Sequence, residues 1–157
     1  MSIVHKVEFE RIKREHAEVI ALLTLLAKKR QKANAGKKGQ LAGVPSFDPD
    51  IIETAVANAN DAYALLLIAK SEAFMRTYLD SLNVPLGAEP KLSLLIDRCR
   101  REFNKQNPKI PIRTDAAQEV HYLREQRNAY AHGYSSNVFP PIARIVNILG
   151  RFFDQLP

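Results

Sequence analysis

Apolar residues recur every three or four positions along most of the chain, a spacing that places them on one face of an α-helix. Over residues 4–29 the pattern predicts a first, long amphipathic helix. A second is expected to begin at Asp48-Pro49-Asp50, because aspartate caps free N–H groups and proline suits the first helical position, and to run to about Leu82. Glu72 interrupts its apolar stripe, so this acid either faces a basic partner or lies exposed at the stripe's edge.

Three shorter helices are predicted in the second half of the chain. One covers about residues 92–107, and the next has Thr114 or Asp115 as its cap and ends before Gly133. The last follows Pro140-Pro141 and carries a strongly apolar face. No segment alternates like a strand, so we expect an all-α fold, an up-and-down bundle of four main helices plus one shorter helix.

Length and composition indicate one soluble globular domain. The chain has 157 residues, 46% hydrophobic and 25% charged, which suits a single domain over residues 1–157 with a basic mobile loop at about 30–47. No apolar run approaches the length of a membrane span and no signal peptide is evident, so a cytoplasmic protein without membrane contact is expected. The single Cys99 allows no internal disulfide and fits a core thiol, and histidines and acids show no ligand spacing, so neither metal nor cofactor is expected.

Positive charge favours a polyanionic partner. The net charge is +6 and the pI about 9.5, which suits nucleic acid before a membrane surface. Lys28 to Gly43 holds six basic residues, three glycines and no acid, so it is either a solvated linker or an arm that contacts phosphates. The expected RNA contacts are Lys37 and Lys38 in this loop and Arg98 and Arg101 on the outer face of the helix at 92–107.

The segment from Arg124 to Tyr134 combines side-chain types that a purely structural role seldom requires together. A guanidinium, an amide, an imidazole and two phenols fall within about three turns of one predicted helix. Asn128 and His132 share a face of it, whereas Arg127 and His132 lie about 140° apart. Arg127 and His132 can converge if the helix unwinds near its end, or if two copies meet across a two-fold axis and share a site.

Arg127-Asn128, followed by three residues and His132, resembles the signature of the HEPN superfamily, in which four to six residues separate an arginine from a histidine and a polar residue follows the arginine. The resemblance implies an all-helical fold and, as in the ribonuclease members, catalytic roles for these three residues. It also implies a homodimer that pairs the motif helices around a basic cleft. The expected function is a metal-independent endoribonuclease of toxin, phage-defence or stress type.

RNA cleavage of this kind needs no metal, because the 2′-hydroxyl of RNA is itself the nucleophile. His132 would transfer protons, Arg127 would bind the phosphate, and Asn128 would orient one of them or the ribose. The expected supporting residues are Glu72, Arg124 and Tyr130.

Tyr134 extends the resemblance to HEPN toxins in which the tyrosine after the histidine is modified by a nucleotidyltransferase antitoxin. Such an antitoxin is therefore a candidate partner, the alternative being an ordinary packed tyrosine. A homodimer is also favoured by the apolar residues of Leu22–Leu26 and Ile142–Phe153, which exceed what one small bundle obviously buries.

The alternative function is a non-catalytic HEPN-like domain that binds RNA, nucleotide or a protein partner. In that case His132 satisfies the last carbonyls of its helix and Arg127 forms an ion pair with Glu72 or Glu125. The position of the motif discriminates between the two functions. If Arg127 and His132 point into the monomer core and not into an open cleft, binding or scaffolding becomes the better account.

Overall fold

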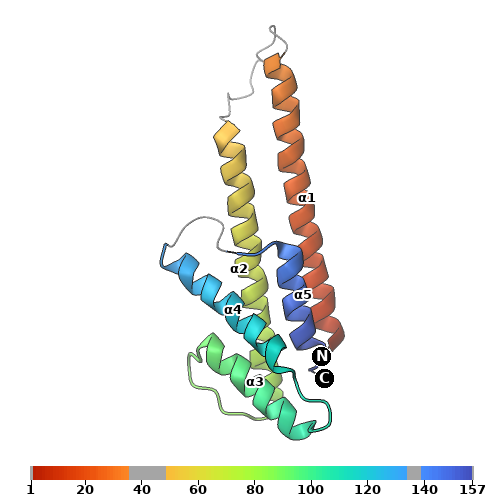
Figure 1. Cartoon of the computed structure of the whole chain (residues 1–157), viewed down its shortest axis with the longest axis vertical. Coiled ribbons are helices and arrows are strands. Elements are labelled where there is room, and N and C mark those ends of the chain that lie inside the picture. Colours follow the sequence, from red (N-terminus) through yellow and green to blue (C-terminus); the bar gives the residue numbers. More distant parts are fainter. Residues whose placement is uncertain (1, 36–48, 134–138, 157) are drawn as a thin grey trace.

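The computed structural model describes residues 2–35, 49–133 and 139–156, and every regular element in these ranges is a helix (Figure 1). The elements are α1 (Ser2–Ala35), α2 (Pro49–Ser81), α3 (Leu92–Gln106), α4 (Thr114–Ala131) and α5 (Ile142–Phe153). They pack as an all-α bundle in which α5 is the shortest element, so the predicted fold class is confirmed.

The long first helix extends beyond its predicted end. α1 continues to Ala35, so the predicted basic loop at about 30–47 is helical at its beginning. The rest of this segment, with Lys37 and Lys38, lies outside the described residues. α2 starts at Pro49, as the sequence predicted.

α1 and α2 run antiparallel and side by side, while α3, α4 and α5 pack only around one half of this hairpin (Figure 1). The register is set by contacts from Glu8 to Lys70, 3.2 Å, and from His16 to Asn60, 2.6 Å. Among the described side chains, the last buried one of α1 is Ile12 and the first of α2 is at position 61. Residues 17–35 and 49–59 therefore project as a two-helix arm.

The core lies in the other half and draws on all five helices. Its fully buried members include Phe9, Leu67, Leu95, Leu123 and Leu149. Each such side chain contributes about 1.5–3 kcal/mol relative to full exposure. The apolar face of α5 is also buried within this one chain. The expectation that Ile142–Phe153 leaves apolar surface for a second subunit is therefore wrong.

The two ends of the described chain lie together at one pole of the molecule (Figure 1). The His5 ring is buried near Phe9 and Phe153, at centroid distances of 5.9 and 5.3 Å. Its Nε2 atom lies 3.4 Å from Oδ1 of Asp154, and Nζ of Lys6 lies 3.0 Å from the same oxygen. These contacts fasten the beginning of α1 to the end of α5.

Cys99 is fully buried on α3, with Sγ 3.7 Å from the carbonyl oxygen of Met75. Burial raises the pKa of its thiol to about 12, because the thiolate would lose its hydration. The prediction of a core thiol is confirmed.

α2 departs from the expectation that no apolar run approaches the length of a membrane span. By length and apolar content alone, residues Asp50–Ser81 match a membrane-spanning helix, the one such segment in the described residues. Core helices of soluble proteins match the same criteria, and α2 places Leu67, Ile68 and Leu79 in the bundle core. The cytoplasmic location stays a prediction.

Candidate functional site

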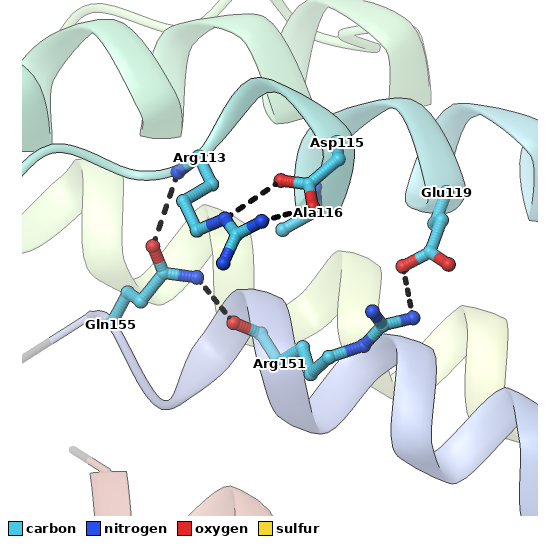
Figure 2. Close-up of polar contacts among 6 residues, drawn as sticks. All are labelled: Arg113, Asp115, Ala116, Glu119, Arg151 and Gln155. Carbon is cyan, nitrogen blue, oxygen red and sulfur yellow. Dashed lines mark hydrogen bonds and ion pairs between the residues drawn. The ribbon is translucent and has the colours of Figure 1, made fainter.

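The first half of α4, the helix that carries the motif, is fastened to the end of α5 (Figure 2). The backbone N–H of Arg113 donates to Oε1 of Gln155 at 3.1 Å, and Arg151 forms an ion pair with Glu119. All buried residues of α4 lie in its first ten positions, between Ala116 and Leu123. The last two turns of α4 therefore leave the bundle, and the motif lies on these turns.

The start of α4 differs from the predicted capping. Arg113 occupies the cap position, and its own side chain makes no capping hydrogen bond. Thr114 is the first helical residue and accepts a hydrogen bond from Arg100 at 2.8 Å. The carboxylate of Asp115 pairs with Arg113 at 2.9 Å and accepts from the N–H of Ala116 at 3.0 Å. The prediction that Thr114 or Asp115 occupies the cap position is wrong. Arg100 binds the side chain of Thr114, and Arg113 binds that of Asp115.

The end of α4 agrees with its sequence. Gly133 has a φ of +74°, a left-handed conformation that favours glycine, and its N–H donates to the carbonyl of Tyr130 at 3.0 Å. The N–H of His132 still donates to the carbonyls of Asn128 and Ala129, at 3.1 and 3.2 Å. The helix therefore does not unwind before His132, and the offset of about 140° between Arg127 and His132 persists within one chain.

Glu72 has basic partners, which decides between the two alternatives that the sequence left open for it. Its carboxylate lies 3.5 Å from Nη1 of Arg127 on α4 and 2.8 Å from Nη2 of Arg76 on α2. Glu72 is only 19% exposed, whereas Arg127 is 44% exposed. The ion pair thus holds one side of the Arg127 guanidinium and leaves the rest open to solvent.

The other motif side chains are also accessible. Asn128 and His132 are exposed. Tyr130 is partly exposed and its ring lies 5.5 Å from that of Phe139, just before α5. Arg124 is less exposed, with Nη2 3.1 Å from Glu125. Arg127, Asn128 and His132 are thus open to solvent, whereas the Nε atom of Arg124 is buried.

Tyr134, the candidate modification site, lies outside the described residues.

The two arginines predicted to bind RNA from α3 have different surroundings. Arg98 is partly buried and donates to the carbonyl of Pro85, which fixes the α2–α3 connection. Arg101 is exposed, with Nε 3.4 Å from Glu102. It lines a shallow hollow of about 450 Å³ on the outer face of α3, whose other lining residues are Asp97, Arg100, Asn104 and Lys105. Arg101 is therefore the better placed of the two for a phosphate.

Sequence reasoning did not assign a role to His121, which lies near both the hollow on α3 and the motif on α4. It precedes Asn128 and His132 by seven and eleven residues, which places all three on one stripe of α4. Its Nε2 lies 3.1 Å from Oδ1 of Asp97 at the α3 hollow. A polar stripe of about 16 Å thus runs from the hollow to the motif. The helical spacing was visible in the sequence, but the contact with α3 was not.

Over residues 2–35, 49–133 and 139–156, no group of three or more histidine, cysteine or acidic side chains is arranged to hold a metal ion. No family model, curated protein or solved structure matches this chain. The functional assignment therefore rests on the motif and its geometry.

Proposed function

We propose that this protein is a metal-independent endoribonuclease of the HEPN type, acting in toxin, phage-defence or stress response. The observation that carries the proposal is the exposure of Arg127, Asn128 and His132 together on the last two turns of α4. The Glu72 contact adds support, because it restricts the Arg127 guanidinium without covering it.

The proposed reaction is attack of the RNA 2′-oxygen on the adjacent phosphorus. His132 accepts the 2′-hydroxyl proton, the bond from phosphorus to the 5′-oxygen breaks, and that oxygen takes a proton from water. The imidazolium of His132 then returns its proton to the hydroxide that is left. The products are a 2′,3′-cyclic phosphate and a 5′-hydroxyl end. Arg127 stabilises the charge that gathers on the phosphate, and Asn128 orients the ribose or the imidazole.

A homodimer completes this site. Arg127 and His132 of one chain point in directions about 140° apart, so one helix cannot direct both at the same phosphate. Two copies of the projecting end of α4, related by a two-fold axis, bring Arg127 of one chain toward His132 of the other.

The alternative is a non-catalytic domain that binds RNA, nucleotide or a protein partner. The same 140° offset favours it, and so does the Glu72 ion pair, which already partners Arg127 in a single chain. Binding of RNA without cleavage would identify this function.

The deciding experiment compares wild-type protein with His132→Ala on RNA in the presence of EDTA. We expect wild-type protein to leave cyclic-phosphate ends and His132→Ala to lose about 10²- to 10⁴-fold in rate, as when a general acid–base is removed. The matched control is His16→Ala, which deletes an imidazole at the base of the arm and retains cleavage. Cleavage as fast as that of wild-type protein by both His132→Ala and Arg127→Ala would contradict the assignment. Loss of wild-type activity with EDTA would contradict it as well.

A further inference from the structure

The outward face of α1 carries an unusual concentration of exposed apolar side chains. They are between 50% and 63% exposed, and they are Val4, Val7, Leu22, Leu25 and Leu26. On a regular helix they fall within a sector of about 100°, and the buried Phe9 and Ile12 lie outside it. In the described residues α1 packs on α2 and α5 but not on α3 or α4, and it forms one edge of the molecule (Figure 1).

Four charged residues between Val7 and Leu22 lie on this face or within about 20° of its edge. Two arginines, Arg11 and Arg14, come before two glutamates, Glu15 and Glu18. Apolar residues therefore lie on both sides of these four charges, whose sign changes at the centre. Such an order is self-complementary when a second copy lies antiparallel to the first.

The pairing follows directly from this order. If the two-fold axis passes between positions 14 and 15, these four charged residues meet opposite charges, and Val4, Val7, Leu22 and Leu25 meet apolar residues. The facing pairs are Val4 with the partner's Leu25, Val7 with the partner's Leu22, Arg11 with the partner's Glu18, and Arg14 with the partner's Glu15.

The charges of the single chain are consistent with a missing partner. Arg11 is engaged by Glu8, at 2.8 Å, and by Glu15. No ion pair within the described residues engages Arg14 or Glu18, and both side chains are exposed. An antiparallel copy would supply each with an opposite charge close by.

We propose that the outward face of α1 is an interface with a second copy of this chain, antiparallel and centred between Arg14 and Glu15. The inference goes beyond the proposed function. α1 does not touch α4, so this pairing leaves the motif of each chain open and is tested separately from RNA cleavage.

Cross-linking of the double variant Val7→Cys/Leu22→Cys tests the register. Within one chain the two positions are about 22 Å apart along a helix, too far for a disulfide. Across the interface each cysteine meets the other kind, so mild oxidation should give a covalent dimer on a non-reducing gel. Cys99 is fully buried and should not take part.

Each single variant is a control, because its cysteine would face a leucine or a valine of the partner. A double variant that forms no covalent dimer would overturn the proposal. Leu22→Cys that cross-links alone and as efficiently would show a different register and overturn it as well.

Light scattering on the full chain tests the association without oxidation. Leu22→Glu should weaken the dimer by at least about tenfold, since it buries an unpaired charge in an apolar contact. Ile110→Glu is the matched control, because Ile110 is 74% exposed but lies between α3 and α4, and its mass should equal that of wild type. A wild-type monomer at tens of micromolar would overturn the proposal. A cross-linked dimer without RNase activity would support this interface and contradict only the proposed function.

Discussion

Glu72 on α2 is the residue that connects this helix to the motif on α4. It receives Arg76 from its own helix and Arg127 from α4, 55 positions further along the chain. The sequence left open whether Glu72 faces a basic partner or lies exposed at the edge of its stripe. The answer depends on how α4 crosses α2.

Glu72→Gln should lower RNA cleavage by about tenfold while leaving the helical fold intact. The amide keeps the shape of the side chain but loses the charge that holds the Arg127 guanidinium, and misplaced catalytic groups lose rate steeply. The effect should appear mainly in kcat, and circular dichroism checks the fold. Arg76→Gln is the control, since it removes the other ion pair of Glu72 and leaves that with Arg127. Equal kcat values for the two variants would show that Glu72 does not position Arg127.

Glu8 should make stability depend on acid. Hydrogen bonds from Arg11 and then Lys70 lower the pKa of Glu8 from its ordinary 4.5 to about 2. A lowered folded-state pKa contributes stability that is complete above about 4.5 and is lost as the pH falls toward 2. Urea unfolding of wild type and Glu8→Gln should therefore differ most at neutral pH and converge near pH 2. A difference that does not change with pH would contradict this linkage.

At the scale of single elements, helix bodies were predictable and some of their ends were not. The basic content of Lys28–Gly43 suggested a loop, yet residues 28–35 are helical. Lysine, arginine, glutamine and alanine are good helix formers, and the first glycine of the segment is Gly36. Gly133 predicted the end of α4 correctly, because that end depends on backbone conformation alone. The predicted cap at the start of α4 was wrong, because Arg100 and Arg113, which bind Thr114 and Asp115, come from outside the helix.

The end of α4 should depend on Gly133 in a way that another glycine does not. Gly133→Ala should destabilise the protein by about 1 kcal/mol, because alanine resists the positive φ. Gly150→Ala, inside α5 and with open space around its Cβ position, should instead stabilise by about 0.5–1 kcal/mol. Thermal unfolding measures both. Stability losses of equal size would mean that the φ of Gly133 is not what matters.

For the whole molecule, the all-α fold followed from periodicity, because a repeat of three and four needs nothing beyond the local sequence. The two-helix arm could not be predicted in the same way. Periodicity identifies the apolar face of a helix but not how many other helices pack against that face. The motif residues were found by type and spacing alone. Their exposure depends on α4 leaving the bundle, which contacts such as Arg151 with Glu119 determine (Figure 2).

The contact between His5 and Asp154 brings the ends of the described chain together, so the path of the backbone is almost a closed ring. Any tag or domain fused to either end would leave from the same pole, opposite the tip of the arm (Figure 1). A short linker could join the two ends, and the ring could be opened elsewhere. Residues 87–89 suit such an opening, because they are exposed and Gly87 has open space around its Cβ position. The order of the helices along the chain is thus separable from their arrangement in space.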